Sequence, residues 1–321
     1  MSSIPQKKYA IVVAVGPGPE ELERLTDLSE SIAAYAPEMD RFVLIDDAQR
    51  PKELRARTHP SLRDRVAWVP TSPVRDPVGW RDRLTTGIWK AFRHLAGEGE
   101  WEFVLKVDTD SLLIAPPAEA IRKRFAQPDR PSLIGNYYST TTTSEEGWKN
   151  FQPYVEQLRK WLSVYRDPVT QRPKIYCGCG PRGFRRRNLL QKALQHGYVP
   201  SEHCQGGGYA LTGEALATAD RAGIWQDEYL WTDTAMGEDT ALALSLKSLG
   251  LKIGSANRKG EPFGVVYRGL VAPPDELLRS SFAIIHCLRG DPHLAEPEIR
   301  SIFAKKRKSL IPTERSPSDI R

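Results

Sequence analysis

The first third of the chain alternates between apolar runs and segments with a helical repeat. Residues 9–15 (YAIVVAV) form an unbroken run rich in β-branched side chains, which is typical of a strand buried on both faces of a parallel sheet. Between Glu20 and Tyr35 the apolar residues recur close to a 3.6-residue period, which predicts a helix that ends before Pro37. The same patterns predict two strands, a helix and another strand, in that order, at residues 41–47, 65–69, 80–96 and 101–107. This alternation predicts an α/β fold with an open sheet that binds ligands at the carboxyl ends of its strands.

Two of these predicted strands end in pairs of aspartates. Asp46 and Asp47 end one of them, and Asp108 and Asp110 flank Thr109 directly after another. Carboxylates are hard oxygen ligands for a divalent cation, which can in turn bind a diphosphate. An Asp-x-Asp pair also occurs by chance in a chain with this many aspartates, so an ordinary acidic turn is the alternative. Because both pairs fall at the same expected edge of the sheet, one shared ligand is the simpler interpretation.

The second half of the chain carries three consecutive glycines, Gly206 to Gly208. Such a run allows a ligand to approach the backbone closely, although a tight turn has the same composition. Thr212 follows as a predicted N-cap for a helix at residues 213–222.

Glu238 and Asp239 precede an apolar helix predicted at residues 241–249. An aspartate at a helix start is often only an N-cap, but it stays ionised there, as a general base must. Three aromatic residues come shortly before, and they belong either to the core or to a surface on which a sugar ring stacks: Trp225, Tyr229 and Trp231.

His286 closes a strand predicted at residues 281–287. A lone histidine beside an apolar run is more often structural than a metal ligand. Combined with Asp110, however, it supplies the mixed oxygen and nitrogen donors that suit Mn²⁺.

Composition restricts the class of protein. With 321 residues, of which 40% are hydrophobic, the chain is long enough for one large domain or two modest ones. We expect a cytoplasmic protein, because no apolar run approaches the length of a membrane span and the first residues lack a signal-peptide pattern.

The net charge is +6, but acidic residues are interleaved with the basic ones, which argues against a nucleic-acid partner. Denser basic clusters at residues 182–187 and 304–308 are either solvated surface or sites for phosphate or anionic lipid, so peripheral membrane contact stays open.

The remaining features are less informative. The four cysteines, at positions 177, 179, 204 and 287, are expected to be free thiols. A zinc site formed by Cys177, Cys179 and Cys204 with His203 lacks a usual ligand spacing, which leaves the role of these cysteines undetermined. Residues 136–198, with one predicted helix near 155–164, are expected to form an irregular insertion that faces the substrate.

The order of these motifs carries a resemblance to a known family. Lys-Val-Asp-Thr-Asp at 106–110, Gly-Gly-Gly-Tyr at 206–209, Glu-Asp-Thr at 238–240 and a late histidine resemble the nucleotide-sugar-dependent glycosyltransferases of GT-A fold. The chain looks most like the β1,3-galactosyltransferase and Fringe group within them. The resemblance implies a single GT-A-like domain at residues 1–300, built on an open, mostly parallel twisted sheet with helices on both faces. A basic, disordered tail is expected at residues 301–321.

The resemblance also implies roles for individual residues. Asp110 and His286 would hold Mn²⁺ or Mg²⁺, and Asp108 would help to hold the metal or the ribose. Asp239 would be the catalytic base. The nucleotide-sugar donor would be bound by the acidic residues and glycines of the remaining motifs: Asp46, Asp47, Glu238, Gly207 and Gly208.

The activity implied is transfer of a sugar, with inversion, from a UDP-sugar to a carbohydrate, lipid-linked or glycosylated acceptor. A retaining transferase, a metal-dependent phosphohydrolase and an inactive sugar-nucleotide-binding module remain the alternatives. The chain departs from the family pattern at Thr109, which replaces the middle aspartate, and in lacking a Golgi-type membrane anchor. The second departure suggests a bacterial-type cytosolic enzyme.

Overall fold

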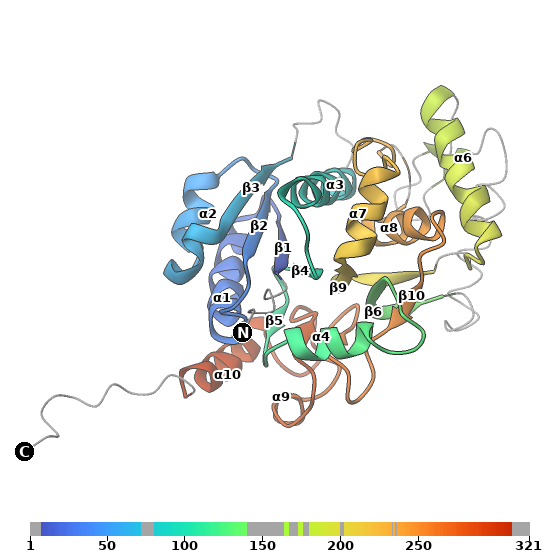
Figure 1. Ribbon diagram of the computed structural model, residues 1–321. Coiled ribbons are helices and arrows are strands. Elements are labelled where there is room, and N and C mark those ends of the chain that lie inside the picture. The colour runs from blue at the N-terminus through green and yellow to red at the C-terminus, as the bar shows by residue number, and fades with distance from the viewer. Residues whose placement is uncertain are drawn as a thin grey trace, which may run out of the picture.

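The computed structural model describes residues 8–71, 80–139, 164–166, 173–175, 180–199, 202–232, 234 and 236–309. A seven-stranded sheet in the order β10-β6-β9-β4-β1-β2-β3 runs through their centre (Figure 1). The strands are β1 (Tyr9–Val15), β2 (Arg41–Asp46), β3 (Val66–Pro70), β4 (Phe103–Asp108), β6 (Leu133–Tyr138), β9 (His203–Thr212) and β10 (Ile253–Ser255). Only β9 runs antiparallel to its neighbours, so the sheet is mainly parallel, as predicted.

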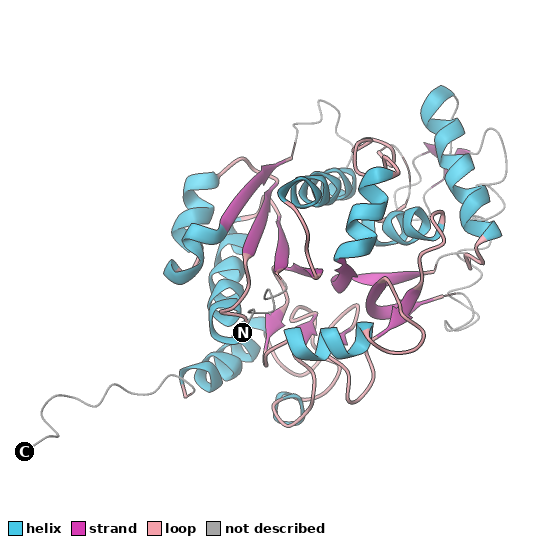
Figure 2. Cartoon of the chain, in the orientation of Figure 1, coloured by secondary structure: helices cyan, strands magenta, loops and turns pink. Residues whose placement is uncertain are grey.

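Helices cover both faces of this sheet (Figure 2). The α-helices are α1 (Pro19–Tyr35), α2 (Pro51–Arg57), α3 (Trp80–Glu98), α4 (Ala118–Phe125), α6 (Gly180–Gln195), α7 (Gly213–Arg221), α8 (Glu238–Lys247), α9 (Pro274–Leu277) and α10 (Glu296–Lys308), and a 3₁₀ helix spans Pro60–Arg65. In β1, Ala10 and Val12 pack on the side of α3, whereas Ile11 and Val13 pack on the side of α1. Successive strand residues point to opposite faces, so a strand covered on both sides needs an unbroken apolar run.

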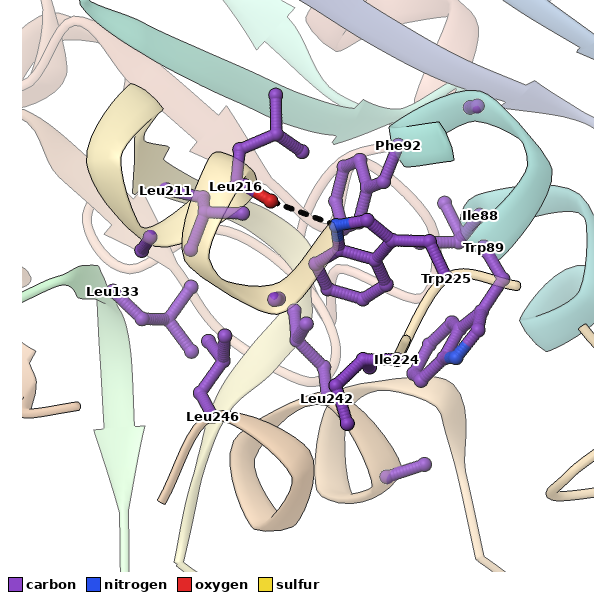
Figure 3. Packing of buried hydrophobic residues seen from close by; sticks show 14 of the residues in the cluster. Ile88, Trp89, Phe92, Leu133, Leu211, Leu216, Ile224, Trp225, Leu242 and Leu246 are labelled. Carbon is purple, nitrogen blue, oxygen red and sulfur yellow. Dashed lines mark hydrogen bonds between the residues drawn. The ribbon is translucent and has the colours of Figure 1, made fainter. Parts of the chain in front are cut away.

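The face covered by α3, α7 and α8 contains an aromatic centre (Figure 3). The indole N–H of Trp225 donates to the carbonyl of Leu216 at 2.9 Å, and the rings of Trp89 and Phe92 meet Trp225 edge-on at 5.5 and 5.1 Å. Trp225 and Trp231 are completely buried. The suggestion that these two tryptophans form a sugar-stacking surface was therefore wrong, and the alternative of a core position is confirmed.

A second, three-stranded sheet lies against the α1 face. It has the order β11-β12-β5 and consists of β11 (Phe263–Val265), β12 (Ile284–His286) and β5 (Leu112–Leu113). Strand β5 follows β4 almost directly and pairs antiparallel with β12, with Leu112 opposite Ile285. This pairing brings the chain just after Asp108 next to His286, although the two segments are far apart in the sequence.

Several elements differ from the expectation. The glycine run lies inside β9 and not in a turn, because that strand pairs with both β4 and β6. Helix α6 occupies part of the segment expected to be irregular, and the helix predicted near 155–164 lies outside the described residues. Thr212 caps α7 as predicted, since its hydroxyl accepts the Ala215 N–H at 3.2 Å.

The basic clusters also differ from a purely solvated surface. In α6, the Arg186 side chain is buried and donates to the carbonyls of Leu230 and Thr232, and Arg185 pairs with Asp227 at 3.3 Å. Residues 301–308 belong to α10, where Ile299 and Phe303 are buried, so they are helical and not part of a disordered tail. Among the described residues, no helix combines the length and apolarity needed to cross a membrane.

Candidate active site

A cavity of about 450 Å³ opens at the carboxyl ends of β1 to β4. The segment from Ala14 to Gly18 forms one wall, and its polar lining includes Asp47, Asp108, Asp110 and Arg289. This is the edge of the sheet at which the aspartate pairs were expected to meet. Asp47 after β2 and Asp108 at the end of β4 do line one common cavity.

The two aspartates after β2 have different surroundings. The Asp47 carboxylate lines the cavity, accepts the Thr71 hydroxyl at 3.0 Å and lies 3.4 Å from Nε of Arg83. Burial raises its pKa, against the hydrogen bond from Thr71. Asp46 is buried and its Oδ1 accepts the Ala48 N–H at 3.0 Å, so it shapes the turn and does not face the cavity.

Asp108 is held by a lysine from its own strand. Nζ of Lys106 lies 2.6 Å from Asp108 Oδ1 and 3.4 Å from Glu238 Oε1, and it also donates to the carbonyl of Gly206. The Lys106 side chain is completely buried. Burial acts to lower its pKa, but the carboxylates of Asp108 and Glu238 outweigh that effect, so the pKa is raised and the amine stays charged. From the sequence, Lys106 was named only as the first residue of the motif at 106–110 and was assigned no role.

Glu238 lies beneath β9 and not on the cavity wall. Burial raises its pKa to about 7, against the opposing charge of Lys106. A Cβ at Gly206 would lie 2.6 Å from Oε1 of Glu238, so the first glycine of the run leaves space for this carboxylate.

Asp110, His286 and Cys287 form a buried cluster. Asp110 Oδ1 lies 3.2 Å from Nε2 of His286, and Oδ2 lies 3.1 Å from Sγ of Cys287 and 2.6 Å from Nε of Arg289. Nδ1 of His286 lies 2.9 Å from the carbonyl of Val266, which orients Nε2 toward Asp110. Burial acts to lower the pKa of His286, but the hydrogen bond to Asp110 raises it to about 10, and the pKa of Asp110 falls well below its usual range.

This cluster fits a divalent cation. One ligand atom from each of Asp110, His286 and Cys287 lies within 4.8 Å of the other two. A ligating histidine normally donates its other ring nitrogen to a carbonyl or carboxylate, and the contact of His286 with Val266 has that geometry. The structure thus brings Asp110 and His286 together, whereas Asp108 turns toward Lys106 on the same cavity.

The other two glycines of β9 pack against the small sheet. A Cβ at Gly207 would lie 2.1 Å from Nδ1 of His286, and a Cβ at Gly208 would lie 3.2 Å from the side chain of Val265. The carbonyl of Gly207 accepts the Ser111 hydroxyl at 2.9 Å. Both glycines are buried and neither lines the cavity, so their packing accounts for the absence of side chains.

Asp239 lies at the first turn of α8. Its Oδ1 accepts the Thr240 N–H at 2.7 Å, and its Oδ2 lies 3.7 Å from Nε2 of His203. The Asp239 side chain is 20% exposed, and its charge contributes to the raised pKa of Lys106. It does not line the 450 Å³ cavity. The carboxylate is therefore partly exposed, and it lies outside this cavity with His203 as its ionic neighbour.

Two further contacts fix the turn between the aspartates. The Thr109 hydroxyl donates to Glu21 of α1, and its carbonyl accepts Nη2 of Arg300 from α10 at 3.2 Å. No sequence pattern pointed to these partners, because each lies far from Thr109 in the chain. Arg289 was missed as well, and its only signal is its position three residues after His286.

Comparisons with known proteins give solved structures only, since no family model and no curated protein matches the chain. Similar structures include the galactosyltransferase LgtC in complex with donor and acceptor sugar analogues, at 14% identity, 95% coverage of this chain, 98% of that chain and a TM-score of 0.45. The bifunctional glycosyltransferase WbbM matches at 10% identity over 99% of this chain and 51% of that chain, with a TM-score of 0.47. The mannosyltransferase PcManGT from Pyrobaculum calidifontis, in complex with GDP-Man and Mn²⁺, matches at 14% identity over 78% of this chain and 55% of that chain, with a TM-score of 0.39. Because likenesses this distant carry no functional argument, the geometry of the site alone supports a function.

Proposed function

We propose that this protein is a metal-dependent GT-A glycosyltransferase that moves a sugar from a nucleotide-sugar, first of all a UDP-sugar, to an acceptor hydroxyl. The observation that carries the proposal is the convergence of Asp110 and His286 beside a cavity at the carboxyl ends of the parallel strands. A cavity of about 450 Å³ is in the range of small-molecule sites. Its position matches the place where open α/β sheets bind nucleotides.

The groups around the cavity match the chemistry of a nucleoside diphosphate. Asp47 can accept hydrogen bonds from a base or a ribose, and Arg289 offers a guanidinium that suits diphosphate oxygens. The Arg289 side chain is 56% exposed, so it can turn from Asp110 toward a ligand. A cation bound by Asp110 and His286, with Asp108 beside them, would supply the charge that stabilises a departing diphosphate. Mn²⁺ and Mg²⁺ are the ions we propose.

Asp239 is the base that we propose for the transfer step. The Thr240 N–H holds Oδ1, which leaves Oδ2 to take the proton from the acceptor hydroxyl. The new bond from the acceptor oxygen to the anomeric carbon forms as the bond from that carbon to the diphosphate oxygen breaks. Attack from the face opposite the leaving group would invert the configuration at the anomeric carbon.

The acceptor class follows from weaker observations. Lys305, Lys306 and Lys308 are exposed at the end of α10, whereas Arg307 beside them is buried and contacts Asp27. Exposed lysines favour an anionic surface, with roughly 1 kcal/mol for each lysine near a charged membrane. A lipid-linked acceptor presented at such a surface is therefore our first choice, with a soluble carbohydrate acceptor as the second.

A panel of nucleoside diphosphates and nucleotide-sugars, measured by thermal shift with and without Mn²⁺, tests the proposal. We expect stabilisation by one nucleotide class that depends on the metal. An NMR assay of the anomeric configuration in the product then separates inversion from retention. Release of free phosphate or sugar at the same rate with and without acceptor would indicate a phosphohydrolase. Absence of any nucleotide-dependent shift would contradict the proposal.

A further inference from the structure

Cys287 faces the same carboxylate as His286, from the adjacent position in the chain. Its Sγ lies 3.1 Å from Oδ2 of Asp110, and the side chain is 3% exposed. The two oxygens of Asp110 thus have different neighbours: Nε2 of His286 lies at Oδ1, whereas Sγ of Cys287 lies at Oδ2 together with Nε of Arg289. From the sequence, Cys287 is expected to be only a free thiol.

The strand pairing sets this arrangement. Leu112 of β5 lies opposite Ile285 of β12, and Leu113 lies opposite Ile284. Beyond these strands the register shifts by one residue: the Leu288 N–H donates to the Asp110 carbonyl at 3.1 Å, and the Cys287 N–H donates to the Gly269 carbonyl at 3.2 Å. These backbone contacts hold the segment that carries Cys287 beside Asp110.

The surroundings favour a ligand over a packing role. Cys204, the other cysteine among the described residues, is also buried, but it packs in the hydrophobic core and its Sγ donates to the carbonyl of Gly254, at 3.8 Å. Cys287 instead lies where one sulfur, one nitrogen and one carboxylate oxygen are all within 4.8 Å of one another. Three protein ligands with a further position open to substrate are the usual composition of a catalytic metal site.

We propose that Cys287 binds the metal as a thiolate and completes an Asp110–His286–Cys287 site. The inference rests on the proposed metal role of Asp110 and His286 and adds a soft ligand to it. On binding, the thiol proton passes to solvent and the sulfur lone pair goes to the metal. A thiolate shifts preference toward Zn²⁺ and Co²⁺ relative to Mn²⁺, because soft donors select such metals. The open position is then left for a diphosphate oxygen.

Cobalt provides a direct test on the metal-free full-length protein. Co²⁺ gives visible d–d bands whenever it is bound in a low-symmetry site, and a near-ultraviolet charge-transfer band only when a thiolate is a ligand. We expect both bands in the wild type and in Cys204→Ala. In Cys287→Ser the charge-transfer band should disappear, and the affinity for Co²⁺ and Zn²⁺ should fall by about 10- to 100-fold, on the scale seen for altered metal surroundings. In this variant the affinity for Mn²⁺ should fall by a smaller factor than the affinity for Zn²⁺.

Each outcome separates this inference from the proposed function. If d–d bands appear without a charge-transfer band, a metal binds but Cys287 is not its ligand, and the inference is wrong. If the charge-transfer band persists in Cys287→Ser, another thiol is responsible and the inference is again wrong. If Co²⁺ neither absorbs nor stabilises the wild type, the metal role of Asp110 and His286 fails as well. Because the variant could fold poorly, X-ray absorption of the Zn²⁺-loaded wild type gives a second measurement, in which a sulfur neighbour at about 2.3 Å is expected.

Discussion

The imidazole of His286 occupies the space that a side chain at Gly207 would fill. A Cβ at Gly207 would lie 2.1 Å from Nδ1 of His286, far closer than non-bonded atoms approach. Gly207 of β9 and His286 of β12 thus pack directly against each other. Nδ1 is also the atom that faces the Val266 carbonyl, so the contact fixes the ring that presents Nε2 to Asp110.

Gly207→Ala is therefore expected to weaken metal binding. The added methyl group must displace His286 or the strand beneath it, and loss of ring orientation typically costs about 10- to 100-fold in metal affinity. Isothermal titration with Mn²⁺ measures this change. Gly97→Ala in α3 is the matched control, because no atom lies within 4 Å of a Cβ there, and its affinity should equal that of the wild type. Equal Mn²⁺ affinity in Gly207→Ala would show that the contact does not position the ligand.

The elements that could be predicted from the sequence are those with enough length to show a period. β1, α1 and β4 were placed within a few residues, because their side chains alternate between two buried faces or follow one helical stripe. The position of the two aspartate pairs at one sheet edge followed from parallel topology alone. Here local pattern and tertiary structure agree.

The details of the site could not be predicted, because short and distant contacts decide them. A strand was predicted at residues 281–287, and β12 lies within it, but β5 has only two residues and shows no pattern of its own. Their pairing, which brings Asp110 close to His286, therefore had no signal in the sequence. The buried state of Lys106 depends on Glu238, which lies on a helix far along the chain. The glycine run was interpreted as a place where a ligand approaches the backbone or as a tight turn, because no sequence pattern shows that Glu238, His286 and Val265 pack against it.

Asp239→Asn tests the proposed base. The amide keeps the shape of the side chain but cannot take a proton, so we expect kcat to fall by about 10²- to 10⁴-fold. Stabilisation by a nucleoside diphosphate with Mn²⁺ should persist, because Asp239 lies outside the cavity. Asp275→Asn on exposed α9 serves as the control and should retain the wild-type rate. A normal rate in Asp239→Asn would assign the base to another group.

Lys106→Met should strongly destabilise the fold. The substitution leaves Glu238 buried without its cation, and breaking a buried ion pair costs about 3–5 kcal/mol. Urea unfolding measures the loss. In the Lys106→Met background, Glu238→Gln should lower the free energy of unfolding by less than it does in the wild type. The carboxylate that the second substitution removes has then already lost its cation. Lys90→Met is the control, because Nζ of Lys90 lies 3.9 Å from Oε2 of Glu228 and both side chains are partly exposed, so the change should lower the free energy of unfolding by less than about 1 kcal/mol. An equal cost for both lysines would contradict the burial argument.

Lowering the pH should weaken the packing of α10 against α1, because Glu296 becomes protonated. This carboxylate accepts Nη2 of Arg24 at 2.8 Å and Nε of Arg300 at 2.9 Å. Burial acts to raise its pKa, but the two arginines outweigh that effect and the pKa is lowered. The unfolded chain, with a pKa of about 4.3, then binds more protons than the folded one at acidic pH. The stabilisation is therefore complete above about pH 4.3 and is lost as the pH falls through the folded pKa.

Glu296→Gln measures this contribution. At neutral pH we expect the variant to be less stable than the wild type by about 1.5–3 kcal/mol, the usual value of hydrogen bonds to a charged group. The difference should shrink as the pH falls below about 4, because the wild-type carboxyl then becomes neutral as well. Urea unfolding at a series of pH values gives both quantities, and Glu119→Gln at an exposed position of α4 should stay within about 0.5 kcal/mol of the wild type. A difference that is independent of pH would mean that the shape of the side chain, and not its charge, connects α10 to α1. Arg300 also donates to the Thr109 carbonyl, in the turn that carries Asp108 and Asp110. A charge-dependent result would therefore show that the charge of Glu296 helps to hold α10 against this turn.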